Sequence, residues 1–240
     1  MSRLVSYAVL LCLTGTTAAM SDTTPIISPK NPDGRPSFDV LAASASVNAD
    51  TVTFAMRLAA TAGAETPDPN GALAGADVWS YVWPTSVDPA SVGFEAGTGL
   101  LALAATSHPD FDDTPAVDES GDGKADNDGA LWHSHWVVLV PNDQCGADAL
   151  SVRDIPAGQN PKLPATWPGL PLFIDSPSNA VTLAQDEISI TIALPGAAGT
   201  NFDGVTAALR VNVDMHTPLL CVTDVFDIAS GDLSLPGKID

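Results

Sequence analysis

Short segments in which apolar and polar residues alternate recur along this chain, and they exclude folds built mainly from helices. The alternation has a period of two at 52–58, at 188–194 and at 209–216. Such a period places successive side chains on opposite faces of a β-strand, with one face buried. The 20 Pro and 19 Gly supply turns between these segments and oppose long helices. We therefore expect an all-β chain, folded as a single antiparallel β-sandwich or jelly roll with long loops.

Further segments extend the predicted strand series along the chain. The segment 131–140 is apolar on both faces apart from its histidines and Ser134, which favours a central strand. The proline-rich stretch 156–177 is expected to wrap over the surface. No linker divides the series, so 37–240 is predicted to be one domain, preceded by an irregular arm at 20–36. The remaining predicted strands are 38–47, 77–83, 100–106 and 226–235.

Residues 1–19 have the pattern of a cleaved secretory signal. Arg3 precedes an apolar stretch from Leu4 to Leu13, and the small residues Thr17, Ala18 and Ala19 follow it. The apolar stretch is too short for a membrane span, which needs about 20 residues. The sequence therefore predicts a periplasmic or secreted protein without a membrane span, whose mature chain begins near Met20.

Cys145 and Cys221 are the cysteines left once the signal segment, with Cys12, is removed. Two cysteines in an oxidising compartment most simply form one disulfide bond. Closing a loop of this length would contribute about 4 kcal/mol in the chain-entropy model. The alternative is that the fold holds the two residues too far apart for a bridge.

The charge balance is strongly acidic, with 29 Asp and Glu against 9 Lys and Arg. A phosphate backbone would be repelled, so nucleic acid is excluded as a partner, and anionic lipid surfaces are disfavoured. The acidic residues either form a solvated shell that keeps the protein soluble, or some of them bind cations. Metal ions are therefore the partners that the charge favours.

The four histidines are the main candidates for chemistry. His133 and His135 lie two apart in an apolar segment, so both imidazoles project from one face of the expected strand. Unpartnered imidazoles are costly to bury there, which favours a transition-metal site for zinc or copper. The alternative is that this pair forms hydrogen bonds inside the sheet while the other two histidines lie on the surface. The predicted ligands are His133, His135, His216 and His108, with Asp214 as a further ligand or as the acceptor that orients one.

The acidic segment 118–129 resembles the calcium loop of EF-hands and dockerins. Hard oxygen ligands stand at alternating positions, and Gly123 supplies the sharp turn at the sixth position. The twelfth position departs from that pattern, because Gly129 replaces the bidentate acid and Asp128 or a remote acid would have to substitute. The alternative is a solvated Asp/Gly turn. The resemblance implies these calcium ligands: Asp118, Ser120, Asp122, Lys124 through its carbonyl, Asp126 and Asp128.

The opening segments 38–47 and 51–58 resemble the first hairpin of DOMON-like and family 9 carbohydrate-binding β-sandwiches. The resemblance covers about 20 residues and implies a module that binds a sugar or haem. Haem is not carried over, because no Met and His pair stands where that family places its haem ligands.

Three functional classes follow from these observations. The first is a secreted or periplasmic metal-binding protein with a histidine site and an acidic calcium-type loop. The second is a non-catalytic carbohydrate- or ligand-binding module stabilised by calcium, and the third is a metal-dependent enzyme. Convergence of the histidines favours the first and third, whereas exposed tryptophans in a row favour the second. The aromatic residues that would form either core or a stacking platform are Trp79, Tyr81, Trp83, Trp132, Trp136 and Trp167.

Overall fold

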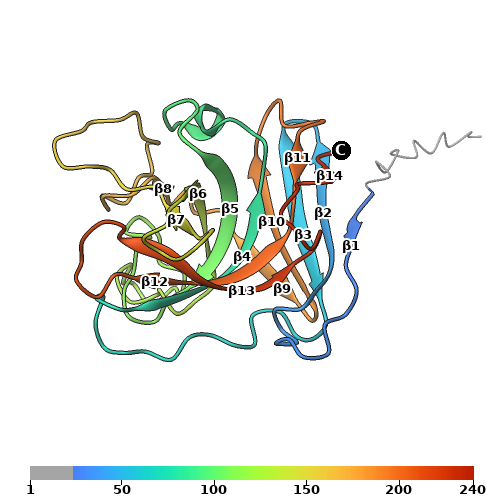
Figure 1. Ribbon diagram of the computed structural model, residues 1–240, viewed down its shortest axis with the longest axis horizontal. Coiled ribbons are helices and arrows are strands. Elements are labelled where there is room, and N and C mark those ends of the chain that lie inside the picture. Colours follow the sequence, from blue (N-terminus) through green and yellow to red (C-terminus); the bar gives the residue numbers. More distant parts are fainter. Residues whose placement is uncertain (1–23) are drawn as a thin grey trace, which may run out of the picture.

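The computed structural model describes residues 24–240, and the predicted signal segment at 1–19 lies outside them. Within this range the regular structure is almost entirely antiparallel β-sheet, which confirms the predicted fold class (Figure 1). The short 3-10 helix η1 (Pro89–Val92) is the helical segment of this part of the chain. No helix in residues 24–240 has the length and apolar character needed to cross a membrane.

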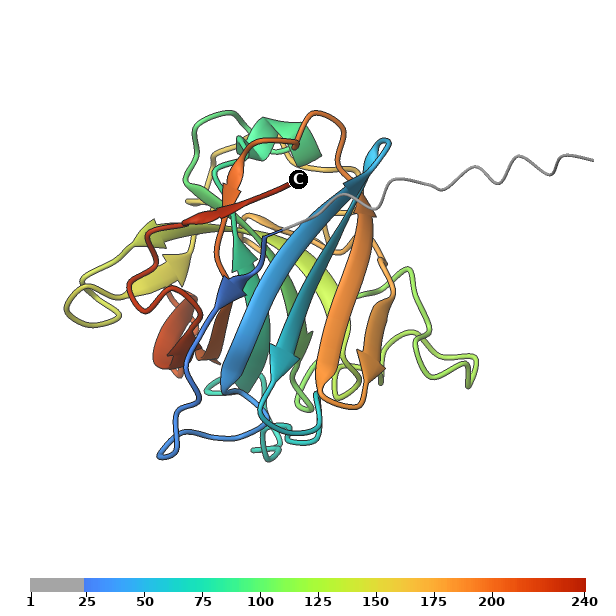
Figure 2. The same cartoon turned by 90° about the vertical axis from the view of Figure 1, so that its right-hand side faces the viewer.

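A five-stranded antiparallel sheet forms one side of the molecule (Figure 2). Its central hairpin pairs Val47 with Val52 and Ala43 with Met56, as the alternating pattern of these segments predicts. The predicted irregular arm at 20–36 adds an edge to this sheet, because Ile26 pairs with Ala43. In order across the sheet, the strands are β1 (Ile26–Ile27), β2 (Val40–Asn48), β3 (Thr51–Leu58), β10 (Glu187–Ala193) and β9 (Val181–Ala184).

The second sheet closes on itself as a six-stranded barrel, so the five-stranded sheet packs on a barrel and not on another open sheet (Figure 1). Closure comes from the pairing of β5 with β6, from Leu100 opposite Leu139 to Thr106 opposite His133. Strand β8 (Ile174–Asp175) adds to the other edge of β6, and β11 (Asn201–Phe202) pairs with β14 (Gly237–Lys238) as a separate ribbon. Around the barrel the strands are β5 (Leu100–Ser107), β4 (Asp77–Pro84), β12 (Val205–Val211), β13 (Leu220–Ile228), β7 (Leu150–Val152) and β6 (His133–Pro141).

The barrel strands nearest the five-stranded sheet are buried on both faces. On β6, Trp136 and Val138 belong to the core between the sheet and the barrel, whereas Val137 and Leu139 belong to the apolar cluster of the barrel interior. This explains why 131–140 is apolar on both sides. It also places His133 and His135 on the interior face, in phase with Val137 and Leu139, as predicted from their spacing.

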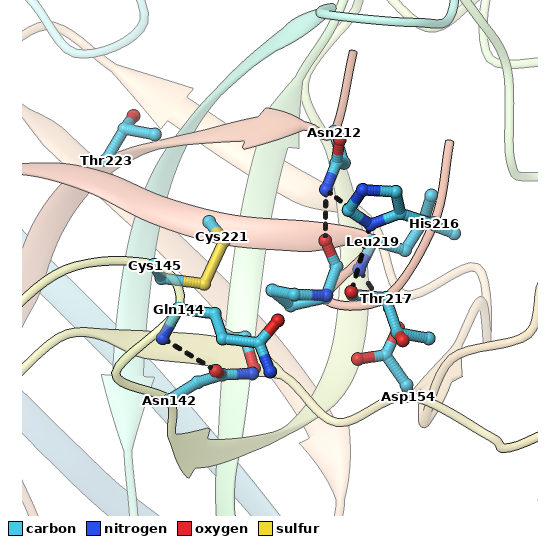
Figure 3. Close-up of a disulfide and its surroundings, with 12 residues drawn as sticks. Asn142, Gln144, Cys145, Asp154, Asn212, His216, Thr217, Leu219, Cys221 and Thr223 are labelled. Atoms are coloured by element: carbon cyan, nitrogen blue, oxygen red, sulfur yellow. Dashed lines mark hydrogen bonds between the residues drawn. A yellow bond between two sulfur atoms is a disulfide. The ribbon is translucent and has the colours of Figure 1, made fainter. Parts of the chain in front are cut away.

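One junction of the barrel is held by few backbone contacts. Strand β7 is three residues long, and its register with β13 consists of Cys221 opposite Ser151. Cys221 also forms the predicted disulfide with Cys145, with 5.5 Å between their Cα atoms (Figure 3). The bridge therefore fastens the loop between β6 and β7 to β13 at the point where those strands close the barrel.

Two predicted strands have different bounds in the structure. The segment expected at 209–216 ends at Val211, because a turn begins at Asn212, whose carbonyl accepts from the Met215 amide. Met215 adopts the left-handed region, with φ of 55°. The closing strand expected at 226–235 is instead β13, which starts at Leu220. Alternation of apolar residues at Val213 and Met215 continued past the true end of the strand.

Candidate metal centre

Three histidines and one aspartate meet at one end of the barrel interior. His133 and His135 begin β6, His108 directly follows β5, and Asp113 comes from the loop that joins β5 to β6. All four side chains are buried, and one ligand atom from each lies within 4.8 Å of the other three. Antiparallel pairing of the end of β5 with the start of β6 brings the histidines together, since Thr106 lies opposite His133.

The distances within this group match a tetrahedral metal site. Asp113 Oδ1 lies 3.2 Å from the Nε2 atoms of His108, His133 and His135. The Nε2 atoms of His108 and His133 are 2.9 Å apart. A tetrahedron with metal–ligand bonds of about 2.0 Å has edges of roughly 3.3 Å. The group is thus the right size for a first-row transition metal and too small for calcium, whose bonds are about 2.3–2.6 Å.

Hydrogen bonds on the far side of each imidazole fix which nitrogen faces the group. His108 Nδ1 lies 2.9 Å from the Phe111 carbonyl oxygen, and His133 Nδ1 lies 2.7 Å from that of Leu131. A carbonyl only accepts, so in each neutral ring Nδ1 carries the proton and Nε2 presents its lone pair. Metal-binding histidines are commonly held in this way.

His135 is held by a serine in the same manner. The Ser176 hydroxyl donates to the Asp113 carbonyl at 2.7 Å, so its proton is already in use. His135 Nδ1 lies 3.1 Å from that hydroxyl oxygen and therefore donates to it. The His135 Nε2 lone pair then faces the other ligand atoms. Ser176 orients His135 and fixes the backbone of Asp113 at the same time.

Two atoms at the centre of the group have no hydrogen bond. Asp113 Oδ1 and His135 Nε2 are fully buried and unpaired, although each has polar atoms about 3 Å away. An unpaired buried polar atom costs about 1–3 kcal/mol. Three converging lone pairs and a carboxylate oxygen repel one another unless a cation lies between them.

The pKa values of the group reflect this crowding. Burial would raise the pKa of Asp113, but His135, His108 and His133 outweigh it and hold that pKa well below its usual value. Burial would lower the pKa of His133, but contact with Asp113 raises it above its usual value. For His135, burial is the larger effect and lowers the pKa. In the metal-free protein His133 thus holds a proton more readily than His135 does.

The loop between β5 and β6 is built to direct Asp113 inward. The His108 amide donates to the Gly129 carbonyl at 2.6 Å, which ties the base of the loop beyond the β5–β6 ladder. A Cβ at position 129 would overlap the Phe111 carbonyl oxygen, so only glycine fits there. Asp112 accepts from the amides of Thr114 and Asp128, both at 2.8 Å. The close contact at position 129 explains why a glycine occupies the position at which a calcium loop has its last acidic ligand.

His216 and Asp214 do not belong to this group, which corrects the prediction that included them. Both lie in the turn between β12 and β13, with His216 Nδ1 3.0 Å from the Thr217 carbonyl (Figure 3). The His216 side chain is 64% exposed and lies 3.8 Å from Asp214. The error has the same cause as the misplaced strand end, because β12 stops at Val211 and cannot carry these residues into the barrel.

The predicted calcium ligands do not form one group among residues 24–240. Asp118 accepts from the amides of Gly121 and Gly123, both at 2.6 Å, and these bonds lower its pKa. Asp128 instead lies close to Asp112 and Glu119, and these three acids form a second group of possible metal ligands among the described residues. Calcium binding by this loop stays a prediction. The other predicted ligands, Ser120, Asp122, Lys124 and Asp126, are exposed or half-buried.

The aromatic residues behave mainly as core. Tyr81, Trp83 and Trp136 are buried between the five-stranded sheet and the barrel, where Trp79 and Trp132 also pack. The structure therefore supports the prediction that these residues belong to the core. Trp167 is exposed, at 37%, and its indole donates to the Leu170 carbonyl at 2.8 Å.

Sequence reasoning missed Asp113, Ser176 and Thr106, whose hydroxyl lies 3.1 Å from His133 Nε2. Asp113 stands among many acids between His108 and Gly129, and nothing local marks it as the one that turns inward. Ser176 directly follows β8, a two-residue strand without any periodic pattern. Their roles depend on contacts made across the fold.

Comparisons of the chain with protein-family models, with curated proteins and with solved structures give no match. The resemblance of the opening hairpin to carbohydrate-binding modules therefore stays a prediction. Any functional conclusion depends on the site itself.

Proposed function

We propose that this protein binds a divalent transition-metal ion, zinc or copper, through His108, Asp113, His133 and His135. The observation that carries the proposal is the pair of buried, unpaired atoms, Asp113 Oδ1 and His135 Nε2. A metal ion would satisfy both of them together with the other two Nε2 atoms. The chain would supply three imidazoles, each already oriented by a hydrogen bond at its Nδ1, and the carboxylate of Asp113, whose backbone carbonyl accepts from Ser176.

The ligand types favour zinc or copper over calcium or magnesium. Imidazole nitrogen suits zinc and copper, whereas calcium takes six to eight oxygen ligands. The net charge of −20 raises the local concentration of any cation near the surface.

We also propose that the protein acts in the periplasm or outside the cell. The bridge between Cys145 and Cys221 supports this, because disulfides persist in oxidising compartments. The signal-like pattern of residues 1–19 agrees with it.

Elemental analysis followed by calorimetry tests the metal proposal. The parent protein should take up about one zinc or copper ion per chain at the four-residue group. His135→Ala should weaken binding by at least about 100-fold, since loss of a direct ligand exceeds the loss of an orienting residue. His216→Ala is the matched control and should bind as the parent does, because His216 is exposed and apart from the group. Unchanged affinity in His135→Ala would contradict the proposal.

A further inference from the structure

The barrel encloses a cavity of about 250 Å³ next to the metal centre. We call this space the barrel lumen. Small side chains, Ser80, Ala104 and Ala207, face it at positions where other small barrels carry larger residues that fill the interior. The rest of its wall is aliphatic, and includes Val78, Val82, Val137, Leu139, Val205 and Leu209.

Polar atoms face the lumen almost only at the metal centre. His108, Asp113 and His135 are its ionisable lining residues. The Ser80 hydroxyl is already used, because it donates to the Ala207 carbonyl at 3.0 Å. Asp113 and His135, which carry the buried unpaired atoms Oδ1 and Nε2, are thus among the residues that line this end of the lumen. A molecule that fits here has an apolar body and one polar group at a single end.

Solvent reaches the lumen past exposed apolar residues. Met215 is 45% exposed and Val225 is 46% exposed, and both line the cavity. Strand β13 pairs with β7 at Cys221, and Val225 lies past that residue, where β13 no longer pairs with β7. A ligand can thus enter without unfolding of the filled core.

The net charge of the metal-loaded centre determines which polar group of a ligand is favoured. A divalent ion with three neutral imidazoles and the Asp113 carboxylate leaves one positive charge on this group, and the lining of the lumen holds no acid besides Asp113. An uncompensated buried charge is unfavourable, and a singly charged anionic ligand would neutralise it. No Lys or Arg lines the lumen, so the metal centre is the only cationic position that the described lining offers.

We propose that the lumen binds a small monocarboxylate with an aliphatic body, its carboxylate as a fifth ligand of the metal and its chain along the aliphatic wall. This inference rests on the proposed metal function. The volume sets the size of the ligand, since a cavity of about 150 Å³ holds benzene. By that measure, 250 Å³ holds roughly ten non-hydrogen atoms, as in octanoate.

Octanoate titrated into the zinc-loaded protein tests this by calorimetry. Zinc uptake is measured first in the same sample. Octanoate should bind the loaded protein, and at least about tenfold more weakly after zinc is removed, because the carboxylate then loses its cation. Absence of zinc uptake contradicts the proposed function and this inference together. Zinc uptake without octanoate binding contradicts the inference alone.

A lumen-filling variant supplies the structural control. Ala207→Leu places a larger side chain in the lumen and should weaken octanoate by about tenfold, with zinc affinity unchanged, since each lost methylene contact lowers affinity. Ala193→Leu adds the same atoms at an exposed position of β10 and should change neither affinity. Octanoate binding unchanged in Ala207→Leu overturns the inference.

A second measurement does not depend on that variant folding. In the cobalt(II)-loaded protein, the paramagnetic ion should broaden the NMR signals of octanoate next to its carboxylate more than its methyl signal. Equal broadening along the chain, or none, overturns the proposed orientation.

Discussion

The two faces of the barrel strands differ in how completely they are filled. On the outer face, Tyr81, Trp83 and Trp136 pack against the five-stranded sheet in a core of large side chains. On the inner face of the same strands, Ala104 and Val137 border a cavity of about 250 Å³. One backbone therefore carries a face that stabilises the fold and a face that leaves room for a ligand.

The candidate metal centre lies on the less filled face. Its three imidazoles are held by hydrogen bonds from Nδ1 to the Phe111 carbonyl, the Leu131 carbonyl and the Ser176 hydroxyl. Changes to the two faces should consequently separate stability from binding.

Loss of the disulfide should cost the most stability. The bridge between Cys145 and Cys221 closes a loop with a sequence separation of 76 and fastens the weakly paired junction of the barrel. The double variant Cys145→Ala, Cys221→Ala should lose about 4 kcal/mol of unfolding free energy in urea. The reduced parent is the control and should match it. Free thiols in the denatured, unreduced parent would show that the bridge is absent.

Adding volume to the two faces of β5 should destabilise the fold to different extents. Ala105 faces the filled core and Ala104 faces the lumen, one residue apart. Ala105→Leu should destabilise the fold by about 1–3 kcal/mol through overpacking. Ala104→Leu should cost less than about 1 kcal/mol, because the cavity accepts the added atoms. Equal losses in urea unfolding would show that the faces are filled alike.

Metal binding should release a proton near neutral pH. Contact with Asp113 raises the pKa of His133 above its usual 6.5, so His133 is mostly protonated at pH 6.5. Zinc must displace that proton, so its affinity should rise with pH until His133 is neutral and then level off. Calorimetry in buffers of different ionisation enthalpy should find proton release at pH 6.5 and less release at higher pH. No release at pH 6.5 would contradict this assignment.

Calcium should have the smallest effect, because the loop 118–129 lies mostly at the surface. If the loop binds calcium, the ion at about ten times its Kd should stabilise the fold by about 1.4 kcal/mol and raise Tm accordingly. Asp122→Ala should remove most of that gain, whereas Asp68→Ala, an exposed acid in another loop, should keep it. A Tm that calcium and chelator leave unchanged in the parent would exclude this site.

Local pattern was enough for part of this fold. Alternation predicted β3 and β10, and the spacing of His133 and His135 placed both on one buried face. It could not predict closure of the barrel, which depends on pairing between β5 and β6 across a long loop.

The site was predictable only where its residues lie on regular strands or beside them. His108 was included although its position depends on the loop base at Gly129. His216 was included wrongly because apolar alternation passed beyond the turn at Asn212. Asp113 was missed because its inward direction depends on Asp112, Ser176 and the close approach of Gly129, none of which shows in a local pattern.

Anomalous diffraction from crystals of the zinc-loaded protein would locate the ion. We expect one strong zinc peak within about 2.0–2.2 Å of Asp113 Oδ1 and of the Nε2 atoms of His108, His133 and His135. The same crystals of Asp113→Asn should show that peak weakened or lost, whereas Asp126→Asn, an exposed acid of the same loop, should keep it. A zinc peak elsewhere, with these four side chains unliganded, would contradict the account.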